Sequence, residues 1–269
     1  MIFALHLSLL FMKKYKSIIF DCYGTLYLFG DMKKAWADWV DAFYRAATNA
    51  GMQLPNKEFL KLIDGFMGQP KPEQCEDNFS LYEQRVKNKL VELGCNFSDT
   101  RIKFIAQNTV EAWHNEITID PNTLETLQLL GKSYRISLLS NFDHPKHIYK
   151  ILKEDKILPY FEEIVISGEV GTDKPDPGIF KILLNKTNLL AKEILYIGDS
   201  EEDYLGSAAA GIDFLLIRRS RVTQNKIALD YRTDTSNLQD DWSKNYEGEI
   251  DIIASLTELI SFVKMINEN

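Results

Sequence analysis

The sequence predicts an α/β fold, in which a parallel sheet carries helices on both faces and is interrupted by an inserted helical domain. Short apolar runs alternate with amphipathic stretches along much of the chain. Short apolar runs are typical of strands that are buried on both faces, and their alternation with helices favours a parallel sheet. The exception lies between about residues 29 and 119, where the patterns are helical and no strand is convincing.

Five apolar runs predict the strands, and the stretches between them predict the helices. The strands are expected at residues 17–20, 136–139, 164–166, 194–197 and 214–217, with helices at 122–130, 145–153, 177–184 and 203–210. In the interrupting interval, Trp36, Trp39, Val40 and Phe43 share one helix face and predict a helical core. A late strand is expected at 250–253, a last helix at 256–265, and a solvated loop at Arg218, Arg219 and Arg221.

These elements divide the chain into two predicted domains. Residues 13–28 and 118–269 form the sheet domain, residues 29–117 the helical domain, and residues 1–12 an N-terminal extension. The extension is apolar, but its lysines follow the apolar run instead of preceding it, unlike a secretion signal. It is also shorter than the ~20 residues that cross a bilayer. Either translation starts at Met12 or this segment packs on the body.

Composition and charge exclude several classes of protein. Of 269 residues, 45% are hydrophobic and 26% charged, the balance of an ordinary globular protein. The net charge of -8 argues against a general nucleic-acid binder, which needs a cationic surface. The three scattered cysteines, Cys22, Cys75 and Cys95, favour a reducing compartment. We expect a cytoplasmic protein with no nucleic-acid or membrane partner, and no pattern indicates its oligomeric state.

Residues with chemical potential follow the predicted strands. Asp21 ends the first strand, with Gly24 to allow a turn and Thr25 to offer a hydroxyl; Ser140 and Asn141 end the second. Lys174 lies between a tight turn and a helix that begins with proline, and Asp199 and Asp203 follow a later strand. Ligands of parallel sheets bind beyond these strand ends, and carboxylate oxygens suit a hard divalent cation. Taken singly, each residue also fits a helix cap, a turn or a solvated loop.

Together, FDCYGTL, LLSN, the lysine of DKPDP and IGDSEED resemble the four motifs of the haloacid dehalogenase superfamily. The resemblance spans about residues 16–217 and implies a Rossmann-like core with a helical cap domain. It implies that Asp21 is a covalent nucleophile and that Mg²⁺ is held by Asp21, Asp199 and the backbone carbonyl of Tyr23. It further implies that Lys174 neutralises charge, that Asp203 orients this shell, and that the substrate contacts residues Gly24, Thr25, Ser140, Asn141 and Lys174.

One position departs from the phosphatases of that superfamily, which carry an acid two residues after the nucleophile. Tyr23 stands there, and a phenol is a poor base at neutral pH. Asp143, His144 and Asp31 are the alternative acids, whereas His114 and His147 are expected on helix surfaces. Loops 28–34 and 67–77 are expected to face the cleft and select the substrate.

The first motif also resembles the 2-haloacid dehalogenases, which need no metal. Against that alternative, Asp199 is a carboxylate where they have an uncharged residue, and Phe180 stands where they have a tyrosine. Two converging carboxylates call for a cation. We therefore predict a Mg²⁺-dependent phosphatase acting on a small phosphorylated metabolite. A dehalogenase, or a low-activity protein that binds a ligand or partner, remains the alternative.

Overall fold

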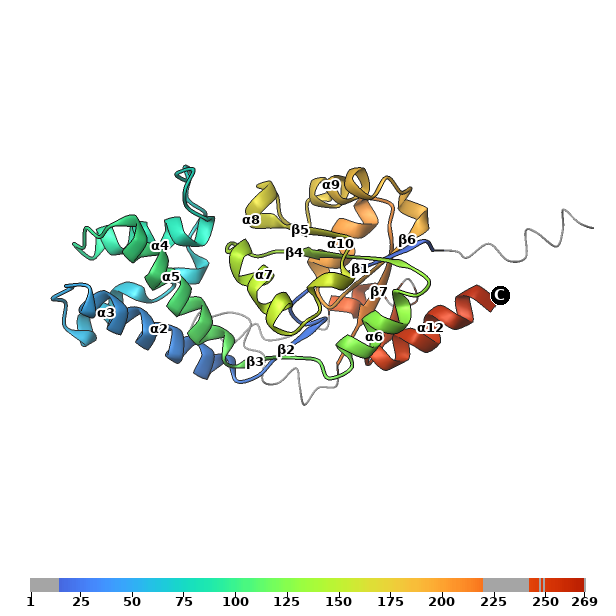
Figure 1. The fold of residues 1–269 in the computed structure, drawn as a ribbon, viewed down its shortest axis with the longest axis horizontal. Helices are drawn as coiled ribbons and strands as arrows, with labels where there is room; N and C mark the ends of the chain where they lie inside the picture. Colours follow the sequence, from blue (N-terminus) through green and yellow to red (C-terminus); the bar gives the residue numbers. More distant parts are fainter. Residues whose placement is uncertain (1–14, 220–241, 247, 249, 269) are drawn as a thin grey trace, which may run out of the picture.

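The computed structural model describes residues 15–219, 242–246, 248 and 250–268 (Figure 1). The predicted extension at residues 1–12 and Arg221 lie outside these ranges. In chain order the elements are β1 (Ser17–Phe20), β2 (Tyr27–Phe29), α2 (Met32–Asn49), α3 (Asn56–Ile63), η1 (Phe66–Gly68), α4 (Leu81–Glu92), α5 (Asp99–His114), β3 (Ile117–Ile119), α6 (Thr123–Leu130), β4 (Arg135–Ser140), α7 (Pro145–Glu154), η2 (Leu158–Tyr160), β5 (Glu163–Ile166), α8 (Ser167–Val170), α9 (Pro177–Thr187), η3 (Ala191–Glu193), β6 (Ile194–Gly198), α10 (Glu201–Ala209), β7 (Asp213–Ile217), η5 (Trp242–Tyr246), β8 (Asp251–Ile253) and α12 (Leu256–Glu268).

The main sheet has six strands in the order β5-β4-β1-β6-β7-β8. Every neighbouring pair in it is parallel, which confirms the predicted α/β class. The five predicted strands are all present, and β8 is the predicted late strand. No described helix combines the length and the apolar character that crossing a bilayer demands.

Alternate residues of β1 supply the two faces of the sheet. Ile18 and Phe20 belong to a buried cluster that includes Leu127 of α6 and Leu259 of α12. Ile19 packs into a second cluster on the other face, with residues from α9 such as Phe180. Because successive strand residues point to opposite faces, one short apolar run fills both layers. This explains why the run lacks the polar alternation of a half-exposed strand.

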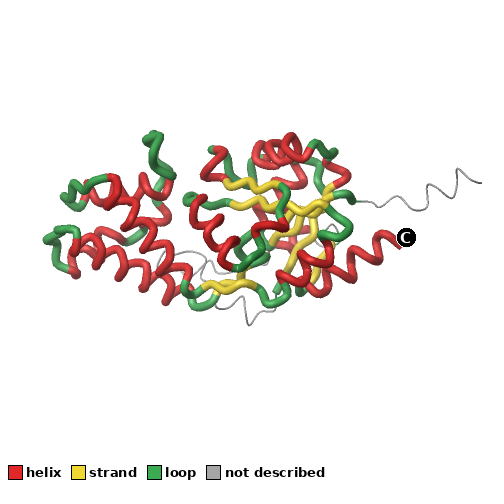
Figure 2. Tube along the Cα trace, in the orientation of Figure 1, coloured by secondary structure: helices red, strands yellow, loops and turns green. Residues whose placement is uncertain are grey.

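Helices α2 to α5 form a separate lobe beside the sheet, shown on the left of Figure 1 and free of strands in Figure 2. Trp39, Phe43 and Phe59 are fully buried in it, so the aromatic stripe is core, as predicted. The lobe joins the rest through β2 and β3, an antiparallel pair with Tyr27 opposite Ile119. Sequence analysis did not predict these two short strands. The domain boundaries at residues 29 and 117 remain a prediction.

Two helix starts fix the loops beside the end of the sheet. Asp176 caps α9 by accepting a hydrogen bond from the backbone N–H of Gly178, and Pro177 begins the helix. The Ser200 side chain caps α10 by accepting a hydrogen bond from the N–H of Asp203. The Asp203 carboxylate in turn accepts one from the N–H of Ser200, which completes a capping box. Such boxes satisfy backbone donors that a helix start leaves open. The residues just before each helix, including Lys174 and Asp199, are therefore held in defined positions.

Candidate active site

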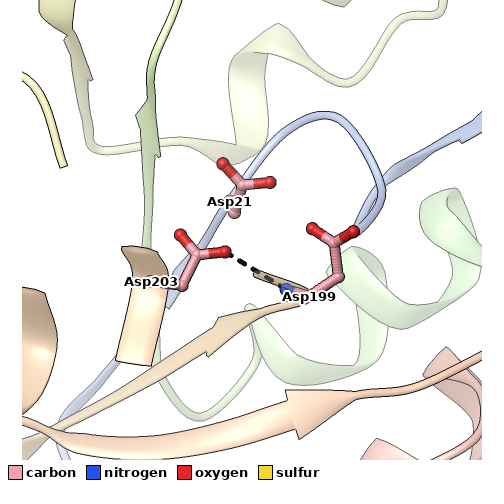
Figure 3. Close-up of side chains that lie close together, drawn as sticks. All are labelled: Asp21, Asp199 and Asp203. Carbon is pink, nitrogen blue, oxygen red and sulfur yellow. Dashed lines mark hydrogen bonds between the residues drawn. The ribbon is translucent and has the colours of Figure 1, made fainter. Parts of the chain in front are cut away.

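Three neighbouring strands carry the predicted site residues to one edge of the sheet. Strand β1 lies between β4 and β6, and Phe20 is paired with Leu138 on one side and Ile197 on the other. Asp21, next along the chain, is therefore flanked by the ends of both strands. Figure 3 shows the carboxylates of Asp21, Asp199 and Asp203 gathered in one place, with one oxygen of each within 4.8 Å of the others.

Lys174 reaches into this group from the loop before α9. Its Nζ lies 2.5 Å from Asp21 Oδ1 and 2.6 Å from Asp203 Oδ1. All three side chains are buried. Burial alone would lower the pKa of Lys174, but the charges of Asp203 and Asp21 raise it above its usual value. The structure therefore brings Lys174, one of the predicted site residues, together with the strand-end carboxylates.

The charges in this cluster do not balance. Three carboxylates converge, and Lys174 supplies one positive charge. Burial raises the pKa of Asp21 to about 7 despite its contact with Lys174. Burial, together with the charges of Asp21 and Asp203, raises the pKa of Asp199 well above its usual value. Within the described part of the chain, the Asp199 carboxylate forms no ion pair. With all three carboxylates ionised, negative charge would exceed positive charge in the cluster by two, and the raised pKa values of Asp21 and Asp199 reflect burial and this repulsion.

Asp203 combines the two roles that the sequence left open. Its Oδ2 accepts hydrogen bonds from the backbone and Oγ of Ser200, which makes it a helix-start residue. Its Oδ1 accepts from Lys174 and, at 2.7 Å, from the hydroxyl of Tyr196. Although burial opposes ionisation, Lys174 and these donors hold its pKa below the usual value. Asp203 is therefore the carboxylate of the cluster with the most complete set of partners.

The turn after Asp21 is shaped by Gly24 and Thr25. Gly24 has a φ of +87°, and its position leaves no room for a side chain beside Asp199. Thr25 is fully buried, and its hydroxyl has no hydrogen-bond partner among the described residues. Arg219 donates to the backbone carbonyl of Thr25 at 2.6 Å and pairs with buried Asp120. The prediction of a solvated loop is therefore wrong for Arg219, which braces this turn.

Ser140 and Asn141 lie at the end of β4, as predicted. Ser140 is buried. The Asn141 amide donates to the carbonyl of Lys174 at 3.0 Å and accepts from its N–H at 2.8 Å. These paired bonds fix the lysine loop against the strand end, so Asn141 positions Lys174. A direct contact with substrate stays a prediction for both residues.

Tyr23 points its ring into an aromatic cluster. Ring centres of Trp113 and Phe142 lie 5.4 and 5.3 Å from its own, and its hydroxyl lies 3.4 Å from Nδ1 of His114. His147 is buried against His114, with 4.8 Å between ring centres. The predicted helix-surface position is therefore wrong for His147, whereas His114 is half-buried at the end of α5. The apolar periodicity of α7 was a usable signal for the burial of His147, because His147 and Ile148 both lie on the buried side of that helix.

The alternative acids have separate environments. Asp31 caps α2 by accepting from the N–H of Lys34 and is exposed, so a helix start accounts for it. His144 is buried and hydrogen-bonded to Ser80 Oγ at 2.8 Å, and burial lowers its pKa to about 4. Asp143 pairs with Arg85 at 3.3 Å, and burial raises its pKa. Of these three, Asp143 is the carboxyl group that faces a cavity.

That cavity has a volume of about 410 Å³ and lies between the helical lobe and the sheet edge. Its lining residues are Trp39, Met67, Lys71, Tyr82, Arg85, Val110, Trp113, Asn141, Phe142, Asp143, His144, Ser167, Asp173, Lys174 and Glu202. Met67 and Lys71 come from the predicted loop 67–77. No residue of loop 28–34 lines it, so this cavity does not support a cleft-facing role for that loop.

Two residues that adjoin the predicted site, Tyr196 and Arg85, were not predicted from the sequence. Tyr196 is fully buried within β6, and its hydroxyl touches both Lys174 and Asp203. A tyrosine in an otherwise apolar buried strand is a usable signal, because its hydroxyl needs a partner. Arg85 lies on the cavity wall from α4. Nothing in the helical pattern of α4 distinguishes it from a solvated arginine.

One curated protein is similar to this chain over nearly the whole length of that protein. A glyceraldehyde 3-phosphate phosphatase from Methanothermobacter thermautotrophicus is 26% identical over 238 residues, which cover 84% of this chain and 98% of the relative. A phosphoglycolate phosphatase from Yersinia pseudotuberculosis is 35% identical over 92 residues, but these cover only 34% of this chain and 39% of the relative.

Among solved structures, a 2-haloacid dehalogenase from Pseudomonas syringae pv. Tomato DC3000 is similar with a TM-score of 0.59 and 18% identity, covering 93% of this chain and 99% of that one. Such an identity shows a shared fold. The sequence model of a family described as haloacid dehalogenase-like hydrolase matches residues 18–217, a range that holds all the strand-end residues above. The chain belongs to the haloacid dehalogenase-like hydrolases, as its four motifs predict.

Proposed function

We propose that this chain is a Mg²⁺-dependent phosphatase that hydrolyses a small phosphorylated metabolite through an aspartyl-phosphate on Asp21. The observation that carries the proposal is the surplus of negative charge at Asp21, Asp199 and Asp203, which one divalent cation would neutralise. The similarity along most of the chain to a glyceraldehyde 3-phosphate phosphatase supports the same chemistry. Cytoplasmic location remains a prediction.

The donor atoms fit Mg²⁺. Asp21 and Asp199 offer carboxylate oxygens, and the backbone carbonyl of Tyr23 is the proposed third protein ligand; oxygen ligands are those that Mg²⁺ prefers. The half-buried Asp199 carboxylate, which forms no ion pair with any residue that the structure describes, is the feature that a cation would satisfy. When bound, Mg²⁺ would offset the repulsion between a phosphate dianion and the nucleophile.

The proposed reaction has two displacements. In the first, an Asp21 oxygen forms a bond to phosphorus while the bond from phosphorus to the alcohol oxygen breaks, and the alcohol leaves with that electron pair and takes up a proton. Lys174, 2.5 Å from Asp21, would stabilise the transferring phosphoryl charge. In the second, water attacks phosphorus, releases phosphate and restores the Asp21 carboxylate. Ser140 and the turn at residues 22–25 would bind phosphoryl oxygens.

The helical lobe would act as the cap, over residues 29–117, and close the cavity above Lys174. Tyr23 supplies no carboxyl group to protonate the alcohol, and general acid help is typically worth about 10²–10⁴ in rate. Turnover of esters with poor leaving groups should therefore be slow. Esters of acidic alcohols, such as phenols, should be hydrolysed faster because they need less proton transfer.

A direct test measures phosphate release from a panel of esters, with Mg²⁺ and with a chelator, beside halide release from 2-chloropropionate. Metal-dependent phosphate release that Asp21→Asn abolishes is the expected result. Halide release that a chelator leaves unchanged would instead establish the dehalogenase alternative, which Tyr23 favours and Asp199 opposes. Binding of phosphate and Mg²⁺ without turnover of any ester would indicate a low-activity binding protein.

A further inference from the structure

The cavity above Lys174 is where the alcohol part of a substrate would lie if the proposed function holds. Lys174 and Asn141 line the cavity, and Lys174 Nζ also contacts Asp21. A phosphoryl group placed at Asp21 would therefore direct the rest of the ester toward the helical lobe. The side chains of the cavity wall would then determine which alcohol part the protein binds.

The wall is largely apolar and aromatic. Its apolar members come from three helices of the lobe and from the loop after β4, and they are Trp39, Met67, Val110, Trp113 and Phe142. Trp113 and Phe142 pack with 6.0 Å between ring centres, so their rings form one continuous surface. Apolar walls stabilise a ligand in proportion to the apolar area that both remove from water.

The cations of the wall already have partners. Arg85 Nε lies 3.3 Å from Asp143 Oδ2, an ion pair without the geometry of a hydrogen bond, and Lys71 pairs with Asp173. Glu202 adds a further carboxylate to the wall, with only a 3.4 Å contact to Asn141. A second anionic group on the substrate would compete with Asp143 and Asp173 for these cations and would be repelled by Glu202.

Two polar side chains of the wall, those of Tyr82 and His144, are bonded to residues outside it. Tyr82 accepts from Trp39 Nε1 and bonds Thr109, both at 2.6 Å, and His144 bonds Ser80. The hydroxyl groups of a sugar-like alcohol would have to compete with these bonds or turn to the wall carboxylates, and they would gain nothing from the apolar rings.

We infer that the substrate, on the proposed function, is a phosphate ester whose alcohol part is apolar and carries no second anionic group. Benzyl phosphate fits this description. Phosphoglycolate and glycerol phosphate do not, although all three are esters of primary alcohols and so make similar demands on the leaving group.

Binding can be measured without turnover by using phosphonates, whose P–C bond the proposed reaction does not break. Benzylphosphonate should quench the tryptophan fluorescence of the full chain with Mg²⁺ present and bind roughly tenfold or more tightly than phosphonoacetate. Equal or tighter binding of phosphonoacetate would overturn the inference. In parallel, kcat/KM for benzyl phosphate should exceed that for phosphoglycolate and glycerol phosphate by a similar factor.

The two sets of measurements separate the inference from the proposed function. Preferential binding of benzylphosphonate with no hydrolysis of any ester would contradict the phosphatase and leave the ligand class standing. Met67→Ala should lower the benzyl preference by roughly tenfold, whereas Leu60→Ala, at an exposed position of the same lobe outside the cavity, should not. An unchanged preference in Met67→Ala would contradict the assignment of this cavity.

Discussion

Gly24 lies against the carboxylate of Asp199 so closely that a Cβ at residue 24 would be 2.1 Å from Asp199 Oδ2. Its φ of +87° is also in the region that side chains disfavour. The turn after Asp21 and the end of β6 therefore meet through a residue that has no side chain. This contact brings Asp199 toward the backbone of the Asp21 loop.

Gly24→Ala should displace Asp199 and lower kcat/KM for phosphate esters by about 100-fold or more, because small misplacements in a catalytic site have effects of this size. Gly94→Ala is the matched control, since Gly94 also has a positive φ but has open space around it. The control should lose some stability and keep its activity. Equal losses of activity in both variants would show that backbone strain, and not the contact with Asp199, is responsible.

Removing the surplus charge should change the response to metal. Asp199→Asn should melt at a higher temperature than wild type in chelator, because repulsion from Asp21 and Asp203 is relieved. Mg²⁺ should then raise the melting temperature of wild type by several degrees and that of the variant by much less. Thermal scans with and without Mg²⁺ check this without reference to turnover. Equal stabilisation of both proteins would place the metal elsewhere.

Tyr196 is a positioning residue for Lys174 and Asp203. Tyr196→Phe removes a hydroxyl that lies 2.7 Å from Asp203 and 3.2 Å from Lys174 but keeps the ring. We expect kcat to fall by about tenfold with little change in KM, because one hydrogen bond to a charged group is lost. The acid limb of the pH profile should also move, since the ionisation of Asp203 depends on that bond.

Tyr149→Phe provides a matched control for this experiment. It removes a hydroxyl that donates to Glu169 at 3.2 Å, outside the active site. Its kcat and pH profile should match those of wild type. If Tyr196→Phe changed only the melting temperature, its hydroxyl would have a structural role alone.

Acid should destabilise the fold through His147. Burial lowers the pKa of His147 to about 3, whereas the unfolded side chain titrates near 6.5. Between these values the unfolded state binds more protons, so stability is lost as pH falls from about 6.5 toward 3. Neither ring nitrogen has a hydrogen-bond partner among the described residues. His147→Phe should therefore match wild type at pH 7.5 and lower the midpoint of acid unfolding by about half a pH unit. An unchanged midpoint would contradict this assignment.

Tyr23→Asp should raise phosphatase turnover by restoring a carboxyl group where Tyr23 stands, by up to about 10²–10⁴. The same change removes a ring packed against Trp113 and Phe142, so the melting temperature should fall. Tyr23→Phe, which keeps the packing, separates the two effects. If Tyr23→Asp binds metal and phosphate as before but gains no activity, phosphoryl transfer is the wrong chemistry.

Sequence patterns locate the sheet and the residues at its edge because both depend on local features. A buried strand such as β1 is a short apolar run, and the chain direction of a parallel sheet places Asp21 and Asp199 at the same edge. The burial of Arg219 was not predictable in the same way. Arg219 is bound to Asp120, a residue distant in sequence, and such pairings leave no local pattern.

The cavity wall also combines features that follow from local sequence with a pairing that does not. Trp39 belongs to the predicted helix stripe, but the pairing of Arg85 with Asp143 joins the lobe to the loop after β4. Sequence analysis treated Asp143 only as an alternative acid and did not see its cationic neighbour. Charge neutrality of a binding surface depends on three-dimensional proximity, and single positions do not reveal it.

Strands β2 and β3 lie side by side, with Tyr27 opposite Ile119, so the chain leaves for the lobe and comes back at the same point. An excursion that begins and ends at neighbouring residues can be lengthened, shortened or exchanged for another without altering the path of β1, β4 or β6. Chemistry and choice of substrate are thereby assigned to separately replaceable parts of the chain. Replacing the helical lobe between β2 and β3 with one from another protein is a practical route to new specificities on the same sheet.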